Sequence, residues 1–449
     1  MGEQTRETFG SRMGFIFAAA GSAIGLGNIW RFPYLVGVYG GAAFLVVYLA
    51  IVIIIGVVCF IAEVSLGRHT RQSNVGAFKA LKPSWAPVGL IGITAGFMIL
   101  SFYSVVGGWT IYYFFRAVAG FKFADPSVSA DLFVGFISNP LSPLLFHALF
   151  MGATIWIVYQ GIQGGIEKYS NIMMPALFVI IVILAIRSMT LPGGGAGLEF
   201  YLKPDFSKID GETLLAALGQ VFFSLSLGMG SILTYGSYLS KDENIPYVCT
   251  VVPLMDTLVA FLAGLVVFPA VFAYGFEPGS GGGLAFITLP AVFNEMPAGN
   301  LFGGAFFFLL FLAALTSAIS LLEPVAAYMI EEHGWERKKA VLIMGTIIFV
   351  VGIACSLSNG VWSGFLIAGK NFFDFMDFVS GNIFLPVSGM LTAIFVAWVW
   401  GSKNALQEAT NDGTVKFGWG NLWANVLIKY VAPILIAVVF LSSVGLIKL

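Results

Sequence analysis

Gly21-Ser-Ala-Ile-Gly-Leu-Gly-Asn28 and Ser224-Leu-Ser-Leu-Gly-Met-Gly-Ser231 are two glycine-rich stretches that interrupt otherwise apolar runs. Lipid offers no hydrogen bonds to backbone groups, so an interruption inside a bilayer needs a ligand, an ion or a neighbouring helix as its partner. Either stretch alone also fits close helix packing through small residues. Their spacing of five apolar runs favours paired broken helices, the pattern of an inverted repeat with its binding site at the breaks.

The composition of the whole chain is that of a membrane protein. Of its 449 residues, 58% are hydrophobic and only 10% are charged, whereas a soluble domain has about a quarter of its residues charged. The net charge of −1 provides no cationic surplus for nucleic acid. Cys59, Cys249 and Cys355 stand apart in apolar stretches and are interpreted as small buried hydrophobes.

Apolar runs long enough to cross a bilayer, about 20 residues each, recur along the chain. The first run follows Arg6 and Arg12 and also resembles a signal peptide, but the ten runs behind it favour a first membrane helix. The eleven expected spans are 12–37, 41–68, 87–120, 142–160, 166–190, 212–240, 247–275, 300–333, 338–359, 373–400 and 420–447.

Neither a soluble domain nor a catalytic motif is visible between the spans. The chain has no HExxH, GxSxG or Walker A sequence, and its three histidines stand alone, so we do not expect an enzyme. Without a nucleotide site, transport would depend on an ion gradient. The longest polar segments, rich in turn-forming residues, are expected to be loops at 121–141, 191–211, 276–299 and 401–419.

Lysine and arginine are distributed in favour of an inside N-terminus, with 13 of the 22 on the inner side. Eleven spans then place Leu449 outside. We therefore expect an all-α polytopic protein of the cell membrane. A single transmembrane domain would cover 1–449, with repeat one at about 12–190, repeat two at about 212–400 and an extra helix at about 420–447.

Four of the ionisable residues within or at the ends of the spans stand out as functional candidates, because charge is costly there and commonly functional. Arg31 and Asp377 lie near outer helix ends and also fit interfacial charges. Glu63 fits pairing with an inner arginine as well as a functional role. Asp256 is deepest, and a carboxylate there would be costly without a partner, which favours a bound cation.

The motifs around these residues resemble those of the neurotransmitter:sodium symporter family. The stretch from Gly21 to Pro33 resembles that family's first helix, and the stretch from Gln220 to Gly230 its sixth. The resemblance covers nearly the whole chain. It implies the LeuT-type fold of two inverted five-helix repeats, here as an eleven-helix variant, and Na⁺-coupled uptake. Further matching segments are Gly40-Gly41, Tyr48, Glu63-Val-Ser-Leu-Gly-Arg68, Gly165 with Pro175, Ala313-Ala-Leu-Thr-Ser317 and Glu323-Pro324.

The resemblance also implies where a substrate would bind. Its carboxylate would meet the amides of Leu26 and Gly27 and the hydroxyl of Tyr103, and its amine would meet carbonyls at the two breaks. The implied substrate contacts are Ser22, Ala23, Gly25, Leu26, Gly27, Ile99, Tyr103, Phe223, Ser224, Ser226, Met229, Ser317 and Leu321.

Two sodium ions are implied as cofactors, held by oxygen donors as a hard cation requires. Without the resemblance, the hydroxyls of Thr316 and Ser317 would fit ordinary bonds to helix carbonyls. The implied sodium ligands are Gly21, Ala23, Ile24, Asn28, Ser224, Asp256, Ala313, Thr316 and Ser317.

Two gates are also implied by the resemblance. Arg31 with Asp377 resembles the outer gate, and Arg6 with Glu331, near Tyr238, resembles the inner gate. Glu331 is one methylene longer than the family's usual aspartate, which makes the inner pair a departure from the pattern.

The resemblance also indicates the substrate class, through Gly25 and the four residues of the expected side-chain pocket. Gly25 stands where the family's amine transporters carry an aspartate, which favours amino acids over decarboxylated amines. The expected side-chain pocket holds no charge, so a charged substrate would be desolvated without a partner. Met229 adapts to bulky groups, although it also fits simple gap filling. We therefore expect neutral, hydrophobic or aromatic substrates. The pocket residues are Ile99, Phe223, Met229 and Leu321.

Chloride dependence is not expected. Asp256 and Ala260 stand where chloride-dependent members carry an asparagine and a serine, and a carboxylate would supply the negative charge itself. Protonation of Asp256 on the return step would make the cycle a proton antiport.

We therefore predict a Na⁺-coupled amino acid symporter that works by alternating access, with the substrate, sodium ions and the lipid bilayer as its partners. A non-transporting amino acid sensor or accessory subunit of the same fold is the alternative. A passive channel is a third option and predicts uptake independent of Na⁺.

Overall fold

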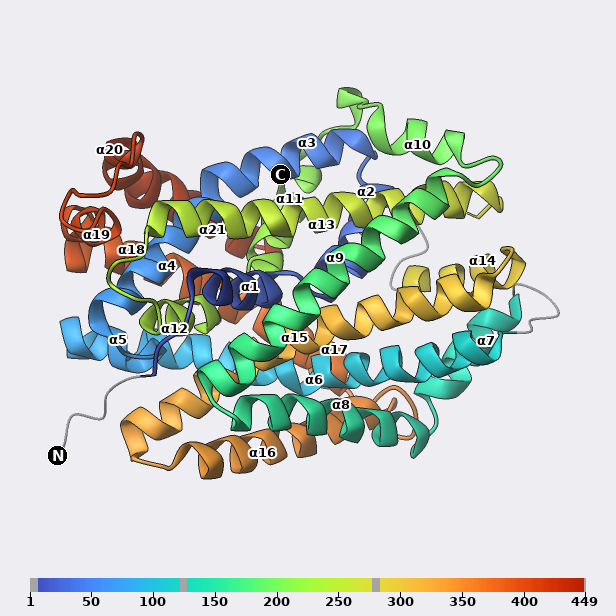
Figure 1. The fold of residues 1–449 in the computed structure, drawn as a ribbon, viewed down its shortest axis with the longest axis horizontal. Helices are drawn as coiled ribbons and strands as arrows, with labels where there is room; N and C mark the ends of the chain where they lie inside the picture. The colour runs from blue at the N-terminus through green and yellow to red at the C-terminus, as the bar shows by residue number, and fades with distance from the viewer. Residues whose placement is uncertain (1–6, 122–126, 277–282, 448–449) are drawn as a thin grey trace.

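The computed structural model describes residues 7–121, 127–276 and 283–447 as a bundle of helices. Within these ranges nine helices are long and apolar enough to cross a membrane, and a pair bent by 50°, Arg12–Ala23 with Gly27–Val38, makes a tenth candidate. Figure 1 shows the long helices running side by side along the longest axis of the molecule. The all-α polytopic fold class is therefore confirmed.

The first five expected spans correspond to helices that pack closely against one another. Glycine allows this close approach, because a Cβ at Gly108 of α6 would lie 2.6 Å from the backbone nitrogen of His147 in α8. The membrane-spanning elements of this half are α1 (Arg12–Ala23), η1 (Gly27–Arg31), α2 (Phe32–Val38), α3 (Ala42–Ile51), η2 (Val52–Gly56), α4 (Val57–Thr70), α6 (Ala86–Ala119), α8 (Ser142–Tyr159), η4 (Ile162–Glu167) and α9 (Lys168–Met189).

The sixth expected span is a broken helix, and it is the first of the next five spans. The two longest helices of the described chain, α6 and α15, pack along each other at the centre of the bundle. The elements of this half are α11 (Gly211–Ser224), α12 (Ser231–Ser237), α13 (Ile245–Ala273), α15 (Gly299–His333), α16 (Arg337–Leu357), α17 (Phe372–Phe378), η7 (Val379–Phe384), α18 (Leu385–Ile394) and η8 (Phe395–Gly401).

A final span follows outside the two halves, formed by α20 (Gly420–Leu422), η9 (Trp423–Val431) and α21 (Ala432–Ser443). It is the most exposed of the candidate spans, because only 22% of its apolar window is buried. Its α21 packs against α18 of the second half.

The polar segments between the spans are not simple loops, as the sequence suggested, but contain short helices. Figure 1 places α5, α12 and α19 at one end of the bundle and α7, α10 and α14 at the other. Small apolar patches in these segments pack on the ends of the spans. This packing stabilises helices that would be too short to be stable alone in water. The short elements are α5 (Asn74–Leu81), η3 (Pro83–Trp85), α7 (Ser127–Ile137), α10 (Gly195–Leu202), η5 (Phe206–Lys208), η6 (Leu284–Thr288), α14 (Leu289–Glu295) and α19 (Ser402–Ala409).

Polar caps set where several helices begin. The Ser11 hydroxyl accepts a hydrogen bond from the Gly14 N–H at 2.9 Å and begins α1. Asp210 begins α11 by accepting from the Thr213 N–H at 2.8 Å. That hydrogen bond favours the charged form, so it holds the pKa of the Asp210 carboxyl below its usual range. Such caps satisfy amides that a helix leaves unpaired at its first turn.

Candidate functional site

The two glycine-rich stretches are helix breaks that meet at the centre of the bundle. The α1 helix ends at Ala23 and the π-helical turn η1 starts at Gly27, while α11 ends at Ser224 and α12 starts at Ser231. Between them the Ser226 hydroxyl donates to the Ser22 carbonyl at 2.8 Å. This hydrogen bond ties one break directly to the other.

The second break depends on backbone conformations that glycine favours. Gly228 and Gly230 have φ of +76° and +78°, and Ser226 between α11 and α12 has φ of +55°. The freed Gly228 N–H donates to the buried Glu63 carboxylate at 2.8 Å. Glu63 on α4 therefore satisfies part of the backbone that the break exposes.

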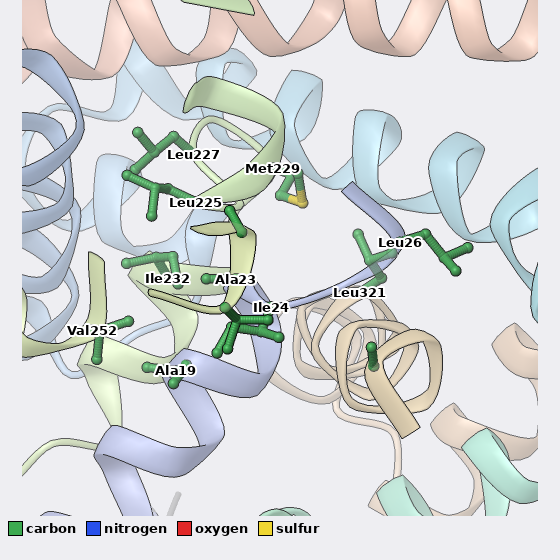
Figure 2. Close-up of a cluster of buried hydrophobic side chains, with 14 of the residues drawn as sticks. Ala19, Ala23, Ile24, Leu26, Leu225, Leu227, Met229, Ile232, Val252 and Leu321 are labelled. Carbon is green, nitrogen blue, oxygen red and sulfur yellow. The ribbon is translucent and has the colours of Figure 1, made fainter. Parts of the chain in front are cut away.

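A small cavity lies where the breaks cross, and twelve of the thirteen residues expected to contact substrate line it. Leu26 is the exception, because it lines a larger outer cavity. Figure 2 shows Met229 beside the extended segment that carries Leu26, with Leu225 and Leu227 on the other side of the second break. The lining residues are Ser22, Ala23, Gly25, Gly27, Ile99, Tyr103, Phe223, Ser224, Ser226, Met229, Ser317 and Leu321.

One end of this cavity is polar and tightly built. The Leu26 N–H donates to the Tyr103 hydroxyl at 3.1 Å. A Cβ at Gly25 would lie 2.6 Å from the Ser317 hydroxyl oxygen and 2.7 Å from that of Tyr103. A side chain at Gly25 would therefore occupy the space between the hydroxyls and the freed amides.

The opposite wall of the cavity is apolar. Ile99 of α6, Met229 of the second break and Leu321 of α15 are all at most 3% exposed. No lining residue carries a charge. This wall suits an uncharged side chain, because a charged one would lose its hydration without gaining a partner.

The carboxylate of Asp256, on α13, lies behind the first break and is fully buried. It accepts hydrogen bonds from Asn28 Nδ2 at 2.7 Å, from the Ser224 hydroxyl at 3.0 Å and from the Tyr48 hydroxyl at 3.3 Å. The Asn28 Oδ1 accepts from the Gly25 N–H at 3.0 Å. The Asp256 carboxylate of the first expected sodium site is thus held by one amide and two hydroxyl donors, while the Asn28 oxygen accepts from a backbone amide.

The residues of the second expected sodium site meet between α1 and α15. The Ser317 hydroxyl lies 3.2 Å from the Gly21 carbonyl oxygen and 3.3 Å from that of Ile24. The Thr316 hydroxyl lies 3.0 Å from the Ala313 carbonyl oxygen. In the described ranges no three His, Cys, Asp or Glu side chains gather to hold a metal, so any cation here would depend on carbonyl and hydroxyl oxygens.

A larger cavity of about 620 Å³ opens at the end of the bundle expected to be the outer one and shares Gly27, Tyr103 and Phe223 with the small one. Arg31 and Asp377 both line it. No ion pair within 4.0 Å joins them in the described chain, and the Arg31 guanidinium instead lies 5.1 Å from the centre of the Phe223 ring. The expected outer gate pair therefore faces a common cavity without direct contact.

The inner side is closed by several layers of contacts. Of the expected inner gate, Arg6 lies outside the described residues, and Glu331 accepts from both the N–H and the hydroxyl of Ser73 at 2.8 Å. The Phe9 ring packs edge-on against Tyr235 and Tyr238. The cavity thus opens at one end of the bundle, and the other end, around Phe9 and Glu331, is closed.

A buried ion pair that sequence reasoning missed completes the inner side. Arg337 Nη2 lies 2.5 Å from Glu323 Oε2, and Arg337 Nη1 lies 3.1 Å from Glu323 Oε1. The Tyr238 hydroxyl donates to the same carboxylate at 2.7 Å, and Arg337 also donates to the Val158 carbonyl. Among the sequence features, Glu323 stood out only in the matching pair Glu323-Pro324, and Arg337 did not stand out. A glutamate buried in α15 with an arginine just past that helix was the available signal.

The N-terminal segment is held against the start of the fifth span. The Gly10 N–H donates to Glu167 Oε2 at 2.7 Å and the Ser11 hydroxyl donates to Glu167 Oε1 at 2.8 Å. The Ile162 N–H donates to Glu7 at 2.8 Å. These contacts fix the inner end of α1 and were not anticipated from the sequence.

Comparisons with known proteins agree with this architecture. The model of the sodium:neurotransmitter symporter family matches residues 6–123 and 141–448. An uncharacterised sodium-dependent transporter of Bacillus subtilis is 39% identical over 451 residues, covering 100% of both chains. The human sodium- and chloride-dependent GABA transporter 2 is 27% identical, over 90% of this chain and 74% of its own.

Among solved structures, the crystal structure of MhsT in complex with L-phenylalanine is similar. It is 47% identical with a TM-score of 0.89, and the match covers 98% of this chain and 100% of the other. MhsT is a transporter of the LeuT fold. A family model over most of the length, and a relative matched end to end, lead to one conclusion: this multi-pass membrane protein belongs to the sodium:neurotransmitter symporter family.

Proposed function

We propose that this protein is a Na⁺-coupled symporter of neutral, hydrophobic or aromatic amino acids and that it works without chloride. One observation carries the proposal. Twelve uncharged residues surround a cavity where two helix breaks cross, and the carboxylate of Asp256 lies behind it. This arrangement offers freed backbone groups to an amino acid and oxygens to a cation.

The polar end of the cavity would hold the substrate's charged groups. Its carboxylate would meet the amides of Leu26 and Gly27, the Tyr103 hydroxyl and the first sodium ion. Its amine would meet the Ala23 and Phe223 carbonyls and Ser226. The tight space at Gly25 supports amino acids over decarboxylated amines, because an aspartate there would fill the place of the carboxylate.

The apolar end would hold the substrate side chain. Ile99, Met229 and Leu321 are buried around it, and MhsT, which is 47% identical, was crystallised with L-phenylalanine. Met229 has no branch at Cβ and adapts to different shapes. This supports aromatic substrates such as phenylalanine, tyrosine or tryptophan alongside leucine-like ones.

Two sodium ions would supply the driving force. The first would be held by Ala23, Asn28, Ser224 and Asp256, and the second by the oxygens between α1 and α15 described above. Each ion moved through 100 mV contributes about 2.3 kcal/mol. Two ions would contribute about 4.6 kcal/mol, enough for roughly a thousandfold accumulation before any sodium concentration gradient is added.

Chloride independence rests on the same carboxylate. Tyr48, at a position that helps to hold chloride in dependent members, and Ser224, at a sodium-ligand position, both donate to Asp256. The carboxylate would therefore occupy the place and supply the charge of the anion. A second negative charge beside it would be repelled.

We further propose an orientation with the N-terminus inside and the C-terminus outside. The single transmembrane domain would consist of repeat one at about 12–190, repeat two at about 212–400 and the extra helix at about 420–447. The outer cavity bounded by Arg31 and Asp377 would then face the outside of the cell, and their approach would close it.

Uptake into proteoliposomes tests the function. Labelled phenylalanine should accumulate with external Na⁺, stop when choline replaces Na⁺, and continue when gluconate replaces chloride. Binding without accumulation would support a sensor or accessory subunit, and uptake indifferent to Na⁺ would support a passive channel. Displacement of labelled substrate by glycine, glutamate or lysine more strongly than by any aromatic amino acid would contradict the substrate class, as would tyramine uptake matching that of tyrosine.

A further inference from the structure

Lys429 lies in the last span, on η9, and its charge is held between two aromatic rings. Its Nζ lies 4.5 Å from the centre of the Trp398 ring and 5.6 Å from that of Tyr430. The two rings meet edge-on at 5.5 Å, and the Trp398 Nε1–H donates to the Lys429 carbonyl at 3.2 Å. These contacts give the lysine a defined place on the surface of the bundle.

The rings are open to the surroundings of the bundle rather than packed inside it. Trp398 is 54% exposed and Tyr430 is 47% exposed. Apolar side chains continue this surface along the helix at the spacing of one helical face. Leu422, Val426 and Ile434 are 51%, 42% and 60% exposed. A helix face of this composition is suited to lipid acyl chains.

No ion pair joins Lys429 to a carboxylate in the described chain. The two acids nearest to it along this part of the chain have other partners. Glu408 pairs with Arg68 and Lys241, and Asp412 accepts from the Gln407 amide at 2.8 Å. Aromatic rings stabilise a cation but do not neutralise it. A charge in a membrane span calls for an anionic partner.

The depth of Lys429 suits the boundary between headgroups and acyl chains. Its ring partner Trp398 lies three residues, about 5 Å along a helix, before the turn at Gly401 where η8 ends, and the long side chain of Lys429 reaches toward that interface. Tryptophan and tyrosine favour the same level. Lys403 and Lys416, both exposed, lie in the segment that precedes the last span, near the end of that span that carries Lys429. In the proposed orientation this end faces the inner leaflet.

We propose that Lys429, Trp398 and Tyr430 bind the headgroup of an anionic phospholipid. The phosphate would lie on the Lys429 ammonium between the two rings, with the acyl chains along the face of Leu422 and Val426. A second copy of the chain fits less well, because a two-fold axis through this face would set one Lys429 against another. An anionic lipid would both neutralise the charge of Lys429 and cover the exposed apolar face of Leu422 and Val426.

Native mass spectrometry of the purified full-length protein tests the site, with phosphatidylglycerol and phosphatidylcholine offered in equal amounts. The native protein should retain phosphatidylglycerol preferentially. Lys429→Gln should reduce that retention about fivefold, as expected for one lysine at an anionic surface, and Lys429→Arg should preserve it. Trp398→Leu keeps the lysine and should reduce retention about threefold through loss of its aromatic contact.

Lys338→Gln is the matched control, because Lys338 also lies over an aromatic ring, that of Tyr159 at 5.3 Å. It should retain as much phosphatidylglycerol as the native protein. Equal retention by Lys429→Gln and the native protein would overturn the proposal. Displacement of phosphatidylglycerol by millimolar inorganic phosphate would overturn it as well, since the site would then recognise a free anion rather than a lipid.

Discussion

Replacement of Asp256 by asparagine removes one negative charge from the proposed first sodium site and keeps a side chain of the same size. The carboxylate is fully buried and accepts from Asn28 at 2.7 Å and from Ser224 at 3.0 Å. A sodium ion about 4 Å from that charge, at an effective dielectric constant of about 20, would lose about 4 kcal/mol of attraction. At 1.4 kcal/mol per tenfold, Na⁺ affinity should fall by about three orders of magnitude.

Equilibrium binding of labelled phenylalanine over a range of Na⁺ concentrations measures this loss. In the native protein the curves with chloride and with gluconate should coincide. In Asp256→Asn the midpoint should move to much higher Na⁺ with either anion. In the double variant Asp256→Asn/Ala260→Ser, chloride should move the midpoint back toward the native value while gluconate should not.

Glu63→Gln is the control, since it removes another buried carboxylate that accepts a hydrogen bond from the Gly228 N–H at a helix break. It should not create a chloride requirement. A Na⁺ midpoint for Asp256→Asn within threefold of the native value would refute the placement of Asp256 beside the ion. A chloride requirement in the native protein would refute the argument that the carboxylate replaces the anion.

Three further changes test other parts of the site. Gly25→Ala should weaken phenylalanine binding about ten- to hundredfold because the added methyl overpacks the polar end of the cavity. The control Gly219→Ala, whose added methyl meets no heavy atom within 4 Å, should leave binding unchanged. Equal phenylalanine affinity of the two variants would contradict the close packing around Gly25. Met229→Phe should shift competition from aromatic toward smaller aliphatic amino acids by about tenfold, and an unchanged order of competitors would mean that Met229 only fills space. Arg337→Met should lower the thermal unfolding midpoint, because it leaves the buried Glu323 carboxylate without its ion-pair partner at a cost of about 3–5 kcal/mol. The double variant Arg337→Met/Glu323→Met should recover part of this loss. A midpoint unchanged by the single variant would show that the pair is not important for closing the inner side.

The fold and the location of the cavity could be predicted from the sequence because both depend on local signals. Long apolar runs require helices in a bilayer, and glycine-rich interruptions such as those at Gly25 and Gly228 mark where a helix stops. Both stretches are breaks in the structure. Residues within three or four positions of a break lie beside it by chain connectivity alone. The individual substrate contacts were implied by the resemblance to the family, and twelve of the thirteen surround this cavity.

The inner contacts could not be predicted in the same way because they join distant segments. Glu323 and Arg337 are fourteen positions apart across the turn between α15 and α16, and nothing in the spacing selects one inner arginine over another. The contacts of Glu167 with Gly10 and Ser11 span more than 150 positions. Such partners follow from how whole helices are arranged.

The short helices in the polar segments were missed for a related reason. The stretch around α10 (Gly195–Leu202) is rich in glycine and was expected to be a loop. In the structure Tyr201 is fully buried and its hydroxyl donates to the Phe261 carbonyl at 3.0 Å. Packing against α13 therefore outweighs the low helix propensity of glycine.

The position of α21 makes the two sides of this transporter unequal. Its Ile436, Val439, Ser442 and Ser443 form part of the wall of the outer cavity, yet α21 lies outside the two inverted repeats and has no symmetry mate at the opposite end. The pseudo-two-fold relation between the two repeats therefore does not extend to α21. A compound that binds in the outer cavity against α21 would have no equivalent site on the inner face, so it would inhibit only from the outer side.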